Sequence, residues 1–210
     1  MIRLRVVFTK QHGLRYVGHL DMAKTWERIL RRAGLPVAYS QGFHPQPKLQ
    51  FASALPVGCA STGEMADVVL SQPLTPEAVL QALAPQLPDG LQVISIVPVP
   101  LDAPALQAAL HSAEYQLSVE TSEPLEALGQ RVRALLEAVS LPRQRRGKSY
   151  DLRPLVLDLR LLEASVGRVT LWAHLLASQS GGTGRPDEVL DALGLAGAPA
   201  DVCRTRLRFS

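Results

Sequence analysis

Cysteine is scarce in this sequence, with only Cys59 and Cys203 among 210 residues. The two lie far apart in apolar surroundings, and neither belongs to a CxxC pair or a cysteine–histidine cluster. A self-contained iron–sulfur or zinc site would need such a cluster, so we expect no cofactor or metal in this chain. We expect two buried, inert thiols and a reducing, cytoplasmic location.

Long apolar runs and the common catalytic motifs are also missing. No run of about 18 apolar residues occurs, so the sequence predicts no membrane span. The opening MIRLRVVFTK alternates between apolar and basic residues, which is typical of a strand rather than a signal peptide. GxSxG, HExxH, GxGxxG and CxxxCxxC do not occur, and the glycine-rich segment 181–188 lacks the P-loop spacing. No recognisable catalytic set remains.

Charge is unevenly distributed, although the net charge is only +3. Residues 1–50 carry +7, residues 51–140 carry −8 and residues 141–210 carry +4. Two basic segments around an acidic middle favour an anionic partner such as nucleic acid. The alternative is that these segments face one another or solvent, since no long run of lysine and arginine exists.

The first half of the chain predicts a β-α-β-β-α-β order. Alternating, β-branched stretches predict strands, and the spacing of Leu20, Trp26 and Leu30 predicts an amphipathic helix. Gly18 is expected to cap that helix and Gly34 to end it, while Thr75 and Pro76 mark the start of the next. The expected elements are strand 2–9, helix 18–34, strand 36–40, strand 64–70, helix 75–87 and strand 91–99.

The second half predicts the same order again, as a repeat of pattern rather than of residue identity. Its expected elements are strand 114–120, helix 123–140, strands 155–164 and 167–177, helix 185–195 and strand 203–209. We therefore predict an α+β fold of two tandem ferredoxin-like units, 1–100 and 112–210, joined by a linker at 101–111. Each unit is expected to carry a basic insertion near its second strand, at 41–60 in the first and at 142–154 in the second.

The first insertion combines the residue types that bind nucleic acid. Phe43 and His44 can stack on a base, and Lys48 can neutralise a phosphate. Pro45 would stiffen the segment, and Gly42 permits a positive φ. The alternative is a rigid surface loop with Phe43 tucked into the core.

The second insertion is a cluster of cations. Arg145, Arg146 and Lys148 suit phosphate oxygens, and Arg153 follows within the motif DLRP. A solvated loop is the alternative. Near the first helix, His19 and Asp21 follow Lys10, but two positions apart on a helix start they point in different directions. We expect them to cap the helix or contact a ligand rather than act as an acid–base pair.

Three stretches together resemble a known family. FTKQHGLRYVGHLD, RRAGLPVAYSQGFHPQPKLQFASALPVG and DLRPLV are similar to the radical SAM-linked proteins, a family of bacterial domains without settled function. The resemblance spans nearly the whole chain. It implies that the protein is encoded beside, or fused to, a cobalamin-binding radical SAM protein, in some genomes near ribonuclease G and ribosomal protein genes. The iron–sulfur cluster, S-adenosylmethionine and cobalamin would then belong to the partner alone.

The resemblance extends to individual residues, with two departures. The family usually has serine where this chain has Gly18, and its loop histidine stands two positions away from His44. Both departures argue against one fixed catalytic side chain. The motif positions carried over are Lys10, His19, Asp21, Tyr39, Ser40, Gly42, Phe43, Pro45, Lys48, Asp151, Arg153 and Pro154.

Three functions remain open from the sequence. The first is a non-catalytic accessory protein that presents RNA, or another anionic substrate, to a radical SAM enzyme. The second is an RNA-processing or RNA-modifying enzyme, by fold analogy with CRISPR repeat-processing endonucleases and pseudouridine synthases, using His19 or His44 with Lys10. The third is a protein-interaction scaffold that binds no nucleic acid.

Overall fold

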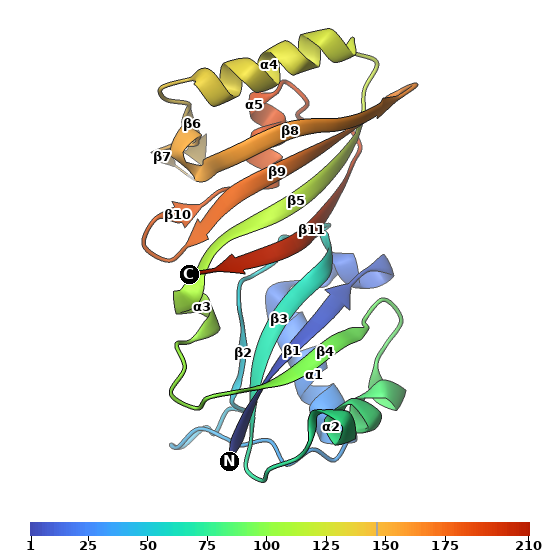
Figure 1. Ribbon diagram of the computed structural model, residues 1–210, viewed down its shortest axis with the longest axis vertical. Helices are drawn as coiled ribbons and strands as arrows, with labels where there is room; N and C mark the ends of the chain where they lie inside the picture. Colours follow the sequence, from blue (N-terminus) through green and yellow to red (C-terminus); the bar gives the residue numbers. More distant parts are fainter. Residues whose placement is uncertain (146) are drawn as a thin grey trace. The chain divides into compact units, whose positions relative to one another are not determined.

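The computed structural model describes residues 1–145 and 147–210, and it confirms the α+β class. The chain divides into two compact units, Met1–Ala109 and Leu110–Ser210, which Figure 1 shows in blue to green and in green to red. The first unit contains β1 (Ile2–Lys10), η1 (His12–Tyr16), α1 (His19–Arg32), β2 (Leu49–Phe51), β3 (Ala60–Leu70), α2 (Pro76–Leu83), η2 (Ala84–Gln86), β4 (Val93–Val99) and α3 (Leu106–Ala109).

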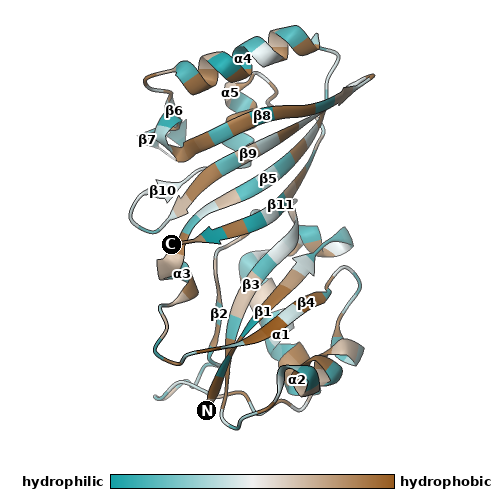
Figure 2. Ribbon diagram, viewed as in Figure 1, coloured by the Kyte–Doolittle hydropathy of each residue, from teal (hydrophilic) through white to brown (hydrophobic). Residues whose placement is uncertain are grey.

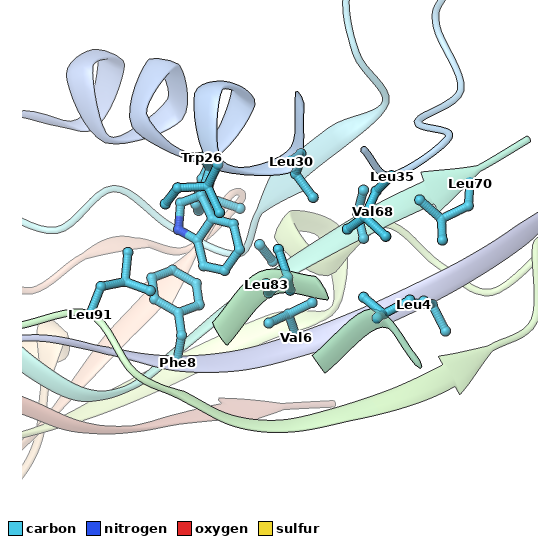
Figure 3. Packing of buried hydrophobic residues seen from close by; sticks show 14 of the residues in the cluster. Leu4, Val6, Phe8, Trp26, Leu30, Leu35, Val68, Leu70, Leu83 and Leu91 are labelled. Atoms are coloured by element: carbon cyan, nitrogen blue, oxygen red, sulfur yellow. The ribbon is translucent and has the colours of Figure 1, made fainter. Parts of the chain in front are cut away.

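The sheet of the first unit has the strand order β4-β1-β3-β2, and its neighbours are all antiparallel. Alternate residues of β1 and β3 are buried and pack against the apolar sides of α1 and α2 in one core. Figure 3 shows Trp26 of α1 facing Phe8 of β1, with Leu83 of α2 beside them. The two rings meet edge to face, 4.9 Å between centroids, a favoured aromatic arrangement.

The helix boundaries of this unit follow their sequence signals. Gly18 is the N-cap of α1, and Gly34 follows its end at φ +66°. The hydroxyl of Thr75 accepts a hydrogen bond from the amide of Ala78, 3.2 Å away, and Pro76 is the first residue of α2. These predictions are confirmed.

The second unit contains β5 (Leu110–Glu120), α4 (Leu125–Glu137), β6 (Pro142–Arg145), β7 (Lys148–Asp151), η3 (Arg153–Leu155), β8 (Val156–Ser165), β9 (Arg168–Ser178), β10 (Gly182–Thr183), α5 (Pro186–Ala192) and β11 (Ala200–Phe209). Its main sheet has the antiparallel order β8-β9-β5-β11, with β10 on the end of β9. Alternate residues of β9 are buried, as are the apolar sides of α4 and α5. Figure 2 shows the resulting bands of both colours along β8 and β9.

Three predictions about segment placement need correction. Residues 36–40 form no strand; their only bridges are the isolated pairs Val37–Leu70 and Tyr39–Pro47, and Pro36 and Pro47 have no backbone N–H to extend a ladder. The second strand, β2, instead lies within the expected insertion 41–60, so the loop precedes that strand rather than following it. The expected insertion 142–154 is a β-hairpin, β6–β7, followed by a 3-10 turn.

Candidate nucleic-acid interface

The loop between α1 and β2 is closed by backbone hydrogen bonds at its base. Lys48 donates to the carbonyl of Ala38, and Ser40 donates to that of Gln46, each at 2.8 Å. The hydroxyl of Ser40 also accepts from the amide of Gln46 at 2.9 Å. Ser40 therefore holds the loop in shape, and the loop at 39–47, light blue in Figure 1, extends from this clasp.

The tip of the loop exposes an aromatic side chain. Phe43 is 101% exposed and Tyr39 is 53% exposed, and His44 and Lys48 are exposed as well. Gly42 turns the backbone at φ +125°, a conformation that other residues rarely adopt. A phenylalanine in water forfeits about 2 kcal/mol of burial energy, which makes this residue available for stacking on a ligand.

A basic ridge lies on the outer side of α1. Lys24, Arg28, Arg31 and Arg32 are all exposed, and their spacing places them along one side of the helix, opposite buried Trp26. This ridge was not identified from the sequence. The signal that could have found it is the i, i+4, i+7 spacing of the cations.

Two grooves flank α1. One, of about 560 Å³, lies between the helix and the loop, and its lining includes Arg31, Pro36, Tyr39 and Pro45. The other, of about 390 Å³, lies between the helix and the segment after α2, and its lining includes Arg28, Arg32, Pro85 and Pro88. Aromatic, proline and guanidinium groups thus meet along the ridge, which is the chemistry that binds bases and phosphates.

The other predicted residues of this unit lie at the opposite end of α1. This helix has 14 residues and is about 21 Å long, so His19 and Asp21 are well separated from the loop. His19 packs edge to face on Phe51, 5.6 Å between ring centroids, whereas Asp21 lies 3.8 Å from Lys24. The structure therefore does not bring His19 and His44 to one site.

Lys10 is buried and braces the chain. Its ammonium donates a 2.8 Å hydrogen bond to the carbonyl of Val17, just before α1. Lys10, buried Glu64 and His19 line a small cavity of about 20 Å³, with apolar neighbours. That volume holds about one water molecule, so the cavity is far too small for a nucleotide.

The hairpin of the second unit pairs its cations with α5. Arg145 lies 3.7 Å from Glu188 and 3.9 Å from Asp187, and Arg143 lies 3.9 Å from Asp191. Lys148 is exposed, while Arg146 lies outside the residues that the structure describes. The acidic start of α5 offsets part of the positive charge that the sequence placed here.

Tyr150 joins the same contact between the hairpin and α5. Burial, together with a hydrogen bond to Glu188 and its negative charge, raises the pKa of Tyr150 to about 12. The neutral phenol is therefore the form that the fold favours. At neutral pH the phenol of Tyr150 therefore keeps its proton, and its contact with Glu188 joins the hairpin to α5.

A family match accompanies this geometry. The family model described as "Uncharacterized protein conserved in bacteria (DUF2344)" matches residues 3–186. The chain belongs to this family. None of the curated proteins compared with this DUF2344 chain matches its sequence.

Solved structures share the fold of this DUF2344 chain. One is from a Cbf5-Nop10-Gar1 complex, with a TM-score of 0.56, and another is from an H/ACA RNP bound to a substrate RNA containing 2'-deoxyuridine, with a TM-score of 0.53. Each is 13% identical and covers 97% of this chain, but only 48% and 47% of the respective solved chain is matched. The chain thus spans about half the length of these neighbours, and the likeness concerns the fold alone.

The DLRP motif of this DUF2344 chain serves the fold. The carboxylate of Asp151 accepts hydrogen bonds from the amides of Leu141 and Arg153, at 2.7 and 2.9 Å, and these bonds lower the pKa of Asp151. The guanidinium of Arg153 donates to the carbonyls of Leu136 and Val156, at 2.7 to 3.1 Å. These contacts account for both side chains without a ligand.

Two further observations concern the described residues. Among them, no helix of this DUF2344 chain is long and apolar enough to cross a membrane. Within the same ranges, no group of three or more histidine, cysteine or acidic residues is arranged to hold a metal ion. Cys59 is buried and Cys203 half-buried, and both are free of disulfides.

Proposed function

We propose that this protein binds single-stranded RNA and acts as a non-catalytic accessory protein of a radical SAM enzyme. The observation that carries the RNA part is the fully exposed Phe43 on a clasped loop, next to the basic ridge of α1. Aromatic side chains stack on unpaired bases, and cations along the same groove follow the phosphates. RNA must be single-stranded for its bases to reach such a tip.

The similarity in fold to solved structures also supports RNA as the ligand. One of the similar solved chains comes from an H/ACA RNP bound to a substrate RNA, and the other comes from a Cbf5-Nop10-Gar1 complex. At 13% identity this likeness suggests RNA as the ligand class without indicating any activity. The antiparallel strand order, with β-α-β-β-α-β succession in each unit, also supports a tandem ferredoxin-like class.

The radical SAM partner rests on the sequence resemblance. In this proposal the partner carries the iron–sulfur cluster, S-adenosylmethionine and cobalamin, while this chain holds the RNA. Affinity capture with the tagged chain should retain a protein that contains CxxxCxxC and measurable iron and sulfide. If cells that contain the radical SAM protein yield no such protein on capture, the proposed accessory role is contradicted. The proposed RNA binding would be unaffected by that result.

The RNA part is tested by substitution at the loop tip. Phe43→Ala should weaken the binding of a labelled uridine 12-mer by about tenfold, because stacking contributes about 1–3 kcal/mol per base. Phe43→Tyr keeps an aromatic ring and should retain most of the affinity. Leu20→Ala is the matched control, since Leu20 is 74% exposed at the other end of α1. Fluorescence anisotropy measures all four proteins.

The outcomes separate stacking from other causes. Equal affinity of the wild type and Phe43→Ala would exclude the loop as the contact. Equal loss in Phe43→Ala and Leu20→Ala would indicate a general effect of removing surface apolar groups. Absence of RNA binding by the wild type would leave the scaffold function as the remaining account.

A further inference from the structure

A tryptophan side chain lies on the outer surface of the second unit's sheet. In β9 the odd-numbered residues are buried beneath the helices, so the even-numbered ones face the other way. Trp172 is one of these, and it is half-buried on that face. Its register neighbours are Arg160 of β8 and Gln116 of β5, so it occupies the centre of a polar sheet surface rather than the core.

The indole of Trp172 is held at its edge. Its N–H donates to the Glu114 carboxylate at 3.3 Å, and the same carboxylate accepts a hydrogen bond from Arg208. His174 lies beside it, with ring centroids 5.9 Å apart, and the His174 imidazole is hydrogen-bonded to Ser112 at 2.8 Å. This network fixes the ring orientation, which lowers the entropy lost when a ligand stacks.

The charges on this face are layered. Glu114 has a side chain only 12% exposed, whereas those of Arg208 and Arg160 are 48% and 65% exposed. Burial by itself raises the pKa of Glu114, but the hydrogen bonds from Arg208 and Trp172 and the nearby positive charges outweigh it, so the net pKa is lowered. The Glu114 carboxylate therefore stays ionised beneath the arginines. A ligand that arrives from solvent meets the guanidinium groups of Arg160 and Arg208 first.

The face of the Trp172 indole is in contact with the guanidinium of Arg160 in this structure. The guanidinium carbon lies 5.1 Å from the centre of the Trp172 ring, and a nitrogen of the same guanidinium pairs with the Asp158 carboxylate at 2.5 Å. The side chain is long and mostly exposed, so it can swing aside. A nucleobase can then take its place on the ring while the guanidinium moves to the adjacent phosphate.

We propose that the outer face of the second unit's sheet binds single-stranded RNA by stacking one base on Trp172, with phosphates on Arg160 and Arg208. The proposal rests on the proposed RNA-binding function and adds a second contact to it. We choose single-stranded RNA as the ligand because an aromatic ring with arginines beside it can stack on an unpaired base while the arginines bind phosphates. In a duplex the base faces are covered by neighbouring bases. An acidic protein segment would use the arginines but leave the indole face without a partner.

Intrinsic fluorescence tests the proposal directly, since the chain has two tryptophans and Trp26 is only 1% exposed. A uridine 12-mer should quench Trp172, whereas its duplex with an adenosine 12-mer should not. Trp172→Leu should abolish the quenching and weaken binding about tenfold. Trp172→Phe should keep most of the affinity, and Arg160→Gln should weaken binding about threefold to tenfold.

The controls keep this proposal separate from the loop proposal. Arg133→Gln, an exposed arginine on α4, should leave affinity unchanged. Full affinity in both folded variants, Trp172→Leu and Arg160→Gln, overturns the sheet-face contact, while loss in Phe43→Ala still supports the loop. No binding by the wild type overturns both. Equal quenching by a polyglutamate peptide would assign the face to an acidic protein instead.

Discussion

Arg153, a predicted substrate contact, forms backbone hydrogen bonds that tie the end of α4 to β8. Its guanidinium is shared between the last turn of the helix and the start of β8. Arg153→Ala should lower the free energy of unfolding by about 2 kcal/mol, because the carbonyls lose charged donors. Urea denaturation measures this, with Arg133→Ala as the exposed control. An unchanged midpoint would show that these bonds contribute nothing net.

Tyr150 gives a prediction with a defined pH window. An unfolded tyrosine has a pKa near 10, and the fold raises that of Tyr150 to about 12. Its contribution is therefore complete below about pH 10 and is lost as the pH rises toward 12. The wild type should lose stability over that window relative to Tyr150→Phe, which has no phenol to ionise. Parallel stability curves for the two proteins would contradict the assignment.

At the level of single residues, sequence could name the motif positions but not their roles. Arg153 donates to backbone carbonyls and Lys10 is buried beside Val17, although both were candidates for ligand contact. A motif letter does not say where a side chain points. Phe43 could equally have been tucked into the core, and only the structure distinguishes this from full exposure.

The turn before β4 shows how elements are joined in the first unit. Gly90 has φ +82°, and a Cβ there would overlap the carbonyl oxygen of Gln11 at the end of β1. Gly90→Ala should therefore destabilise the protein by about 2 kcal/mol or more. Gly34→Ala, also at positive φ but with open space around it, should cost about 1 kcal/mol. Thermal unfolding compares the two, and equal losses would argue against the overlap.

At the level of elements, alternation and capping signals located the long strands and helices. They failed where the element is short or polar. β2 has three residues, too few for a periodic pattern, and β6–β7 is a hairpin whose alternation is among charged and polar residues. The ridge on α1 is present in the sequence only as a helical spacing of Lys24, Arg28 and Arg31, which form no continuous basic run.

At the scale of the molecule, the uneven charge of the sequence has a partial structural explanation. The ridge of α1 lies within the basic first 50 residues, and its cations are exposed. The basic final third is different, because Arg143 and Arg145 are paired with α5. The first segment is therefore the stronger candidate for an anionic partner.

The salt dependence of RNA binding tests this account most directly. Removing three phosphate contacts should make the slope of log affinity against log salt shallower by about 2, since each contact to a single strand contributes about 0.7. The triple variant Arg28→Gln, Arg31→Gln, Arg32→Gln should show that change, measured with the uridine 12-mer, while Arg133→Gln keeps the wild-type slope. A triple variant with the wild-type slope and affinity would contradict the claim that the ridge and loop form the RNA interface.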